Sequence, residues 1–146
     1  MYQTGHGWVP DEIVTGAPVL TLFQNPGAEE EIEGRPTVGK TGQWVARHLH
    51  PPAGLTRGVN VSIANVLKCR WRRWVGMGKG GMWEGTNSLP PEPILTQAMA
   101  HCTSAYLRMP PGVEVVVACG ELAHRYVGAR VVGMVHVWRP DGRQHE

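Results

Sequence analysis

A short apolar run ends in a tight turn at residues 18–27, which read PVLTLFQNPG. Its β-branched and aromatic residues predict a buried strand up to Phe23, and Asn25-Pro26-Gly27 predicts the turn that ends it. Two further strands are expected at residues 59–65 (VNVSIAN) and 113–119 (VEVVVAC). Helical patterns over residues 40–50, 93–107 and 121–126 alternate with these strands. Such alternation indicates βαβ units.

These elements predict an α/β fold: a three-layer α/β/α sandwich with a short, mostly parallel central sheet, in a single domain spanning residues 1–146. Residues 131–138 are expected to form a final strand or an extended tail, and the Gly-, Trp- and Arg-rich residues 70–91 a long loop. Ligands of such sheets bind beyond the carboxyl ends of the strands. The loops after Phe23, Asn65 and Cys119 should therefore meet at one edge.

Composition narrows the classes of protein that this chain can belong to. It has 146 residues, 42% of them hydrophobic, which argues against a wholly disordered chain. No apolar run approaches the roughly 20 residues of a membrane span, so no membrane partner is expected. The first residues show no signal peptide, and three cysteines do not suggest a disulfide framework, so the expected location is cytoplasmic. A net charge of +2 indicates no particular partner.

Residues 34–41 (GRPTVGKT) match the phosphate-binding pattern G-x-x-x-x-G-K-T. A P-loop must directly follow a buried strand, whereas this segment follows four glutamates, which would repel a phosphate and otherwise indicate a solvated surface. Pro36 also removes a backbone N–H from the expected phosphate cradle. A small P-loop nucleotide-binding protein therefore remains only as a second alternative.

Three separated blocks carry a resemblance to a known family. The first joins FQNPGAEEE (23–31) to GRPTVGKTGQ (34–43), the second is NVLKCR (65–70), and the third is Cys102 in a helix, followed by the strand at 113–119 and GELA (120–123). In this order they resemble the uracil-DNA glycosylase superfamily, most closely its iron–sulfur-containing bacterial and archaeal branch. That branch has Gly-Glu-Ala-Pro-Gly, then Gly-x-Pro-Phe-Val-Gly-x-x-Gly-Gln, and Asn-Val-Val-Lys-Cys-Arg.

The resemblance implies hydrolysis of the N-glycosidic bond of a uracil or modified base flipped out of DNA. It assigns the catalytic positions to Gln24 and Asn25, where an Asn would orient the attacking water, and base binding to Pro26, Gly27, Thr37 and Asn65. Asn65 and the turn after the first strand are expected to face each other across one nucleobase-sized cavity. The sequence leaves open whether the protein is an enzyme of weak or divergent activity. The alternative is a catalytically inactive module that binds DNA or a protein partner of replication or base modification.

The sequence departs from the family at several of these positions. Thr37 stands where the family has the Phe that stacks on uracil, and the family's final His-Pro-Ser motif is missing, with His136 expected to be an ordinary strand residue. Cys69 and Cys102 match two of the branch's four cluster ligands, the N-terminal pair is absent, and Cys119 matches none. Because such a cluster needs four thiolates, we expect no cofactor and no metal, with Cys69 and Cys102 as buried residues.

A basic stretch with interleaved tryptophans predicts contact with DNA, either single-stranded or around a flipped base in a duplex. The residues assigned to it are Lys68, Arg70, Trp71, Arg72, Arg73 and Lys79. The alternative is that the tryptophans pack against the domain and fill the volume that a cluster fills in relatives.

Overall fold

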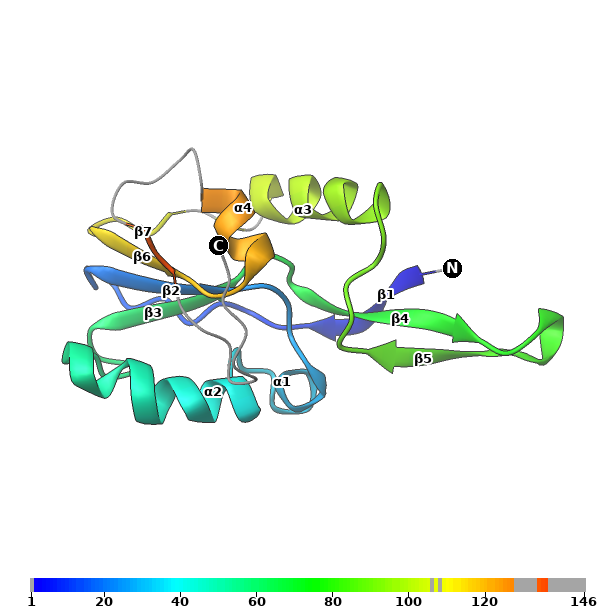
Figure 1. The fold of residues 1–146 in the computed structure, drawn as a ribbon, viewed down its shortest axis with the longest axis horizontal. Helices are drawn as coiled ribbons and strands as arrows, with labels where there is room; N and C mark the ends of the chain where they lie inside the picture. Colours follow the sequence, from blue (N-terminus) through cyan, green and yellow to red (C-terminus); the bar gives the residue numbers. More distant parts are fainter. Residues whose placement is uncertain (1, 106, 108, 128–133, 137–146) are drawn as a thin grey trace.

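The computed structural model describes residues 2–105, 107, 109–127 and 134–136. Its strands form two sheets, one parallel and one antiparallel. The parallel sheet carries helices on both faces, and the antiparallel sheet extends from it to one side (Figure 1).

The parallel sheet has the strand order β3-β2-β6-β7. Its strands are β2 (Val19–Phe23), β3 (Val61–Asn65), β6 (Val115–Ala118) and β7 (Met134–His136). Every neighbouring pair is parallel. The expected parallel sheet is thus confirmed. A final strand or extended tail was predicted at residues 131–138, and β7 lies within this range. Residues 131–133 and 137–138 lie outside the described part of the chain.

Helices cover both faces of this sheet, which confirms the three-layer prediction. They are α1 (Ala28–Glu33), α2 (Lys40–Trp44), α3 (Ile94–Ala105) and α4 (Glu121–Val127). A π-helical segment (Val45–Leu49) and a 3-10 turn (Pro51–Ala53) continue α2. In Figure 1, α3 and α4 lie on one face and α1 and α2 on the other. None of the described helices has both the length and the apolar character needed to cross a bilayer.

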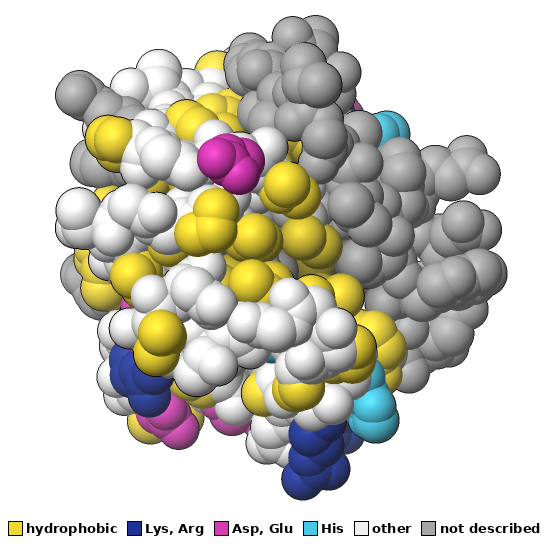
Figure 2. Space-filling model, turned by 90° about the vertical axis from the view of Figure 1, so that its left-hand side faces the viewer, with side chains coloured by type: hydrophobic (Ala, Val, Ile, Leu, Met, Phe, Trp, Pro, Cys, Tyr) yellow, Lys and Arg dark blue, Asp and Glu magenta, His cyan; other side chains and the backbone are white. Residues whose placement is uncertain are grey.

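Side chains of β2 alternate between two cores, as expected for a strand that is buried on both faces. Leu20 and Leu22 pack with Leu122 of α4 and with one side of α3. Phe23 packs with Val45 at the end of α2. Figure 2 views the end of the molecule at which the parallel strands begin, and hydrophobic side chains gather across this face. The carboxyl ends of the strands lie on the opposite side.

The long loop predicted for residues 70–91 is wrong, because most of this segment is a β-hairpin. Strands β4 (Cys69–Val75) and β5 (Met82–Thr86) pair antiparallel around a 3-10 turn (Gly78–Gly80). A Cβ on Gly81 would lie 2.3 Å from the indole nitrogen of Trp74, so this glycine permits the tight closure of the hairpin. The segment shows no clean apolar alternation because most of the hairpin is exposed, and this concealed its period from the sequence.

The antiparallel sheet is completed by β1 (Tyr2–Trp8), which pairs with β4 and for which the sequence provided no expectation. The order of this sheet is β1-β4-β5. Its strand β4 comes next after β3 in the chain, and Figure 1 shows the antiparallel sheet reaching beyond the helices at the side where the parallel strands end. The hairpin is thereby connected to the sheet edge at which the predicted site residues gather.

Candidate functional site

The turn after β2 and the end of β3 lie side by side at the carboxyl edge of the parallel sheet. Phe23 is in register with Asn65. Beyond the strands, the backbone N–H of Val66 donates to the Phe23 carbonyl and that of Leu67 to the Gln24 carbonyl, each at 2.9 Å. Asn65, with 2% of its surface exposed, is therefore held next to the turn that carries Gln24 and Asn25.

The two predicted catalytic amides have different surroundings. The side-chain oxygen of Gln24 accepts a hydrogen bond from the backbone N–H of Leu122, in the first turn of α4, at 3.1 Å. Asn25 instead donates its side-chain N–H to the backbone carbonyl of Asn87, which follows β5, at 3.4 Å. Gln24 therefore fastens the turn to α4, while no residue that the structure describes donates to the side-chain oxygen of Asn25.

The predicted base-binding residues Pro26 and Thr37 are buried, and Gly27 precedes α1 as its N-cap. Thr37 has a left-handed backbone with φ of 55°. Its carbonyl lies against α2, where a Cβ on Gly42 would come within 2.0 Å of the Thr37 oxygen. Thr37 thus belongs to a tightly packed turn that leads into α2.

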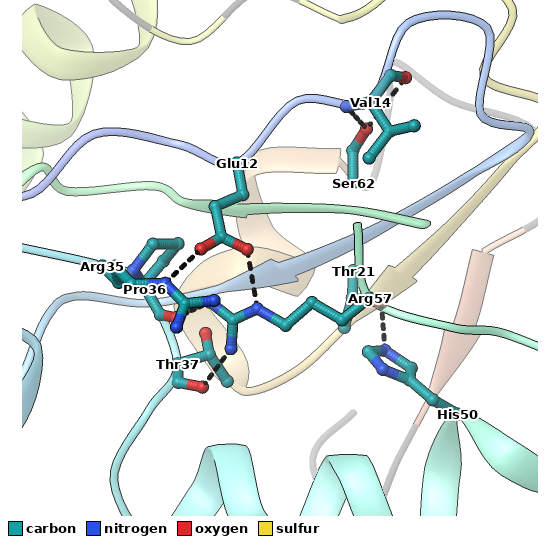
Figure 3. Close-up of polar contacts among 9 residues, drawn as sticks. All are labelled: Glu12, Val14, Thr21, Arg35, Pro36, Thr37, His50, Arg57 and Ser62. Atoms are coloured by element: carbon teal, nitrogen blue, oxygen red, sulfur yellow. Dashed lines mark hydrogen bonds and ion pairs between the residues drawn. The ribbon is translucent and has the colours of Figure 1, made fainter. Parts of the chain in front are cut away.

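An arginine holds this turn from outside, as Figure 3 shows. The Arg57 guanidinium donates to the carbonyl of Thr37 at 2.7 Å and also to the carbonyl of Pro36. Its Nε binds Glu12 at 2.6 Å, and Arg35 binds the other oxygen of the same carboxylate at 2.8 Å. Burial alone would raise the pKa of Glu12, but the hydrogen bonds from Arg57 and Arg35 together hold it below its ordinary value.

Glu30 is a site residue that sequence reasoning missed. A Cβ on Gly27 would lie 3.4 Å from one oxygen of Glu30, and a Cβ on Gly39 would lie 3.3 Å from the other, so this carboxyl lies between the two turns. Burial raises the pKa of Glu30, against the backbone N–H groups of Glu30 and Gly27, and the charge on Glu29 adds to the increase. The glutamates in the first turn of α1 are visible in the sequence, but the sequence analysis assigned them to a solvated surface.

Lys68 and Trp71 do not lie on the surface, which corrects their assignment to the DNA-binding group. The Lys68 side chain is 1% exposed and its ammonium lies 2.7 Å from Asp11, whose side chain is 14% exposed. Burial lowers the pKa of Lys68, against the opposing charge of Asp11, so the pair is held in a partly dehydrated environment. Trp71 is 6% exposed and packs in the core. Trp71 therefore packs against the domain, which the sequence analysis gave as the alternative to DNA contact.

Successive residues of β4 point to opposite faces of the antiparallel sheet, which separates the remaining basic residues. Arg70 donates to the Asn87 side chain at 3.1 Å, and Arg72 lies 4.0 Å from Glu31 of α1. Arg70 and Arg72 thus share the face that adjoins the Asn25 turn. Arg73 points to the other face, and Lys79 lies exposed at the hairpin tip.

The P-loop interpretation does not fit the geometry. Residues 34–41 join α1 to α2 and do not follow a strand of the sheet. A P-loop connects a buried strand directly to its helix. Glu29 and Glu30 also lie beside Gly39, where the phosphate cradle would have to form.

Cys69 and Cys102 are half-buried, not buried as expected, and both line a cavity of about 430 Å³ between β4 and α3. Cys119 belongs to the other core, beside Phe23 and Val45, and burial raises the pKa of its thiol to about 12. Among the described residues, no three His, Cys, Asp or Glu side chains are grouped to hold a metal ion. Two thiols are fewer than the four that such a cluster needs. The expectation of no cofactor stays a prediction.

Part of the chain is similar to curated type-4 uracil-DNA glycosylases. It is 39% identical over 62 residues to the protein of Saccharolobus solfataricus, 39% over 70 residues to that of Sulfurisphaera tokodaii, and 42% over 62 residues to that of Pyrobaculum aerophilum. These matches cover 42%, 48% and 42% of this chain. They span 28%, 31% and 31% of the relatives, which is less than a third of each.

No protein-family model matches the chain. The α/β/α architecture is consistent with a uracil-DNA glycosylase-like fold. This partial homology to type-4 uracil-DNA glycosylases supports membership of the chain in the uracil-DNA glycosylase superfamily.

Proposed function

We propose that the carboxyl edge of the parallel sheet binds a nucleobase flipped out of DNA and that the chain slowly hydrolyses the N-glycosidic bond of that base. The observation that carries this proposal is the register of β2 with β3, which brings the Asn25 turn and Asn65 to the same edge. Because the chain corresponds to less than a third of the curated glycosylases, their activity is carried over only as a proposal.

In this proposal Asn65 reads the polar edge of the base. Within the described structure, the hydrogen bonds of Asn65 are made by its backbone, with the N–H donating to Asp11 and the carbonyl accepting from Lys68. Its side-chain amide, which can donate and accept at once, is left for a ligand. The buried Lys68–Asp11 pair then fixes the backbone of the reading residue, a role different from the one first predicted for Lys68.

Asn25 orients the attacking water. Its N–H group is engaged by Asn87, so its oxygen is the acceptor that remains for a water molecule. The water oxygen bonds to the sugar carbon, the glycosidic bond breaks, and the base leaves with the bonding electrons and takes up the proton that the water loses. An amide positions water but is a poor base, so the hydrolysis is expected to be slow.

Pro26, Gly27 and Thr37 are proposed to form the walls of the base pocket. The Thr37 side chain is short, so it leaves space that an aromatic ring at this position would fill. We therefore expect the preferred base to be a modified or bulkier one than uracil. Arg57 and Gly42 keep the Thr37 turn in place from either side.

DNA is proposed to lie along one face of the hairpin, the face of Arg70 and Arg72. Trp74 and Trp83 share this face and meet edge to face, with ring centres 5.4 Å apart. Basic side chains beside aromatic rings are suited to phosphates and unstacked bases. The face begins at Asn87, beside the Asn25 turn, so a strand bound there would lead directly from the proposed pocket.

An excision panel tests the proposal. Single- and double-stranded DNA carrying uracil or other altered bases is incubated with the protein, and alkali then reveals abasic sites as strand breaks. We expect excision of at least one base, reduced on the order of 100-fold by Asn25→Ala or Asn65→Ala. Asn60→Ala, at the amino end of β3, is the matched control. Salt-sensitive DNA binding without excision of any base would instead support an inactive DNA-binding module.

A further inference from the structure

Two arginines form a row along one face of the hairpin. Arg70 and Arg72 both belong to β4, and side chains on one face of a strand repeat about every 7 Å. The Arg70 guanidinium lies across β5, where a Cβ on Gly85 would collide with its Nη1 atom. Its Nε donates to Asn87 at 3.1 Å, and none of the described residues accepts from its two terminal nitrogens. These nitrogens are therefore left for a phosphate.

The row continues in a pair of tryptophans. Trp74 and Trp83 face each other across β4 and β5, two residues beyond Arg72. Both indoles are half-buried, and their planes meet at 78°, so neither ring fully covers the flat face of the other. Figure 1 shows this part of the hairpin reaching beyond the helices. An indole beside a row of cations is suited to stacking an unpaired base.

Acidic side chains limit what binds along this row. Glu31 of α1 lies 4.0 Å from Arg72, and the exposed Glu29 precedes it in the first turn of the same helix. Among the hairpin side chains described on this face, Arg70 and Arg72 are the basic ones. A second phosphate backbone on the α1 side would meet carboxylates in place of cations and be repelled. The charges thus favour one strand of DNA over two.

We propose that this row holds one unpaired strand of DNA on one side of the target base. Its phosphates bind Arg70 and Arg72. One of its bases stacks on the pair formed by Trp74 and Trp83. This inference rests on the proposed function, because the strand starts at the base pocket, beside Asn87.

The length of the row sets the register of the strand. From Arg70 to Trp74, β4 advances by four residues, or about 13 Å. One strand of a duplex covers about 3.4 Å per nucleotide, so this length holds about four stacked nucleotides and fewer unstacked ones. The stacked base should therefore lie about two or three nucleotides from the target base.

The first test measures binding alone, by fluorescence anisotropy of an unmodified oligonucleotide as a single strand and as a duplex. We expect the single strand to bind about tenfold more tightly, because a duplex must first be unpaired along the row. Trp83→Leu keeps an apolar side chain but removes the ring, and should weaken single-strand binding on the order of tenfold. Trp83→Phe should retain most of the affinity. Met82→Leu, its neighbour on the opposite face, is the matched control and should leave the affinity unchanged.

The second test measures the register. The Asn25→Ala variant is bound to single strands that carry the altered base that native protein excises fastest. An abasic analogue replaces one other nucleotide at a time on either side of this base. We expect the affinity to decrease when the analogue lies about two or three nucleotides away on one side. Adding Trp83→Leu should remove this dependence on position.

The outcomes separate this inference from the proposed function. Excision of a base together with equal or tighter binding of the duplex would overturn the inference and leave the proposed function standing. Native affinity of a folded Trp83→Leu variant, or an equal loss at every abasic position, would also overturn it. A preference for the single strand that Trp83→Leu abolishes, without excision of any base, would support the row of binding residues and contradict the glycosylase proposal.

Discussion

The side-chain amide of Asn25 donates to the backbone carbonyl of Asn87, with 3.4 Å between the two atoms. This contact joins the turn after β2 to the end of a hairpin that begins more than forty residues later in the chain. The Asn87 side chain is held in turn by Arg70. The hairpin thus determines which end of the Asn25 amide is left for the water of the proposed reaction, although the hairpin belongs to a different sheet.

Weakening this link should slow the proposed reaction without weakening DNA binding. Asn87→Ala removes the acceptor for Arg70 while keeping the carbonyl that Asn25 uses, so the hairpin end becomes less firmly placed. We expect the single-turnover excision rate to decrease on the order of tenfold, because small misplacements of a catalytic group are costly. The affinity for DNA should not change. Ser88→Ala is the control, and an equal effect of both variants would contradict the positioning role of Asn87.

The close approach of α2 to the Thr37 turn gives a prediction about stability. In a helix, replacing Gly by Ala ordinarily stabilises by about 0.5–1 kcal/mol. At Gly42, however, the new Cβ would lie 2.0 Å from the Thr37 carbonyl oxygen, a backbone atom that cannot rotate away. We expect Gly42→Ala to lower the free energy of unfolding by about 1–3 kcal/mol, as measured by urea denaturation. Gly80→Ala, which meets no atom within 4 Å, should have little effect.

The Lys68–Asp11 pair should contribute to stability and not to direct DNA contact. Removing one partner leaves the other charge buried and unpaired, which costs about 3–5 kcal/mol. Lys68→Met should therefore lower the free energy of unfolding by this order. The double variant with Asp11→Leu should recover much of the loss, because no unpaired charge remains. A folded Lys68→Met variant with native stability and weakened DNA binding would restore the original surface assignment.

The strands that the sequence predicted correctly are those in which burial limits the choice of residue types. β2, β3 and β6 are buried on both faces, so their sequences carry no charged residue and are mostly apolar. The hairpin was missed because only part of β4 is buried, and its arginines and glycines conceal the alternation. Lys68 was misassigned because its partner, Asp11, lies 57 residues earlier in the chain, and no local pattern reveals such a pairing.

Some residues of the candidate site could be predicted from the sequence, and others could not. Gln24, Asn25 and Asn65 were predicted to share an edge because the ends of parallel strands meet, and the register confirms that they do. The contributions of Arg57 and Asn87 come from segments without a motif, and only the tertiary fold brings them to the turns. Glu30 belonged to a visible acidic run, but burial of a single member cannot be deduced from a run of like charges.

Stability should also depend on His50 as the pH falls below neutrality. The Nε2 atom of His50 lies 3.0 Å from the hydroxyl oxygen of Thr21, a residue of β2 (Figure 3). Burial lowers the pKa of His50 below its ordinary value of 6.5, and the charge of Arg57 lowers it further. The unfolded chain therefore takes up a proton at pH 6.5 while the folded chain does not, so stability is lost from pH 6.5 downward until the folded pKa is reached.

The measurement is the urea midpoint between pH 7.5 and pH 5. His50→Gln should reduce the decrease of the midpoint over this range, because the residue that titrates differently in the two states is removed. His48→Gln, an exposed neighbour two residues earlier, should leave the decrease unchanged. An equal decrease in native protein and His50→Gln would show that other groups cause the dependence.

Two adjacent arginines allow the proposed DNA face of the hairpin to be tested directly. Arg72 and Arg73 belong to the same strand and point to opposite faces of the sheet, and only Arg72 shares its face with Arg70 and the Asn25 turn. Each phosphate contact contributes about 0.9 to the slope of log affinity against log salt for duplex DNA. Arg72→Ala should reduce the slope by about this amount, whereas Arg73→Ala, opposite Glu84 on the other face, should change it far less. Equal reductions would mean that DNA contacts both faces or only the tip, and the strand path proposed from Asn87 along one face would have to be abandoned.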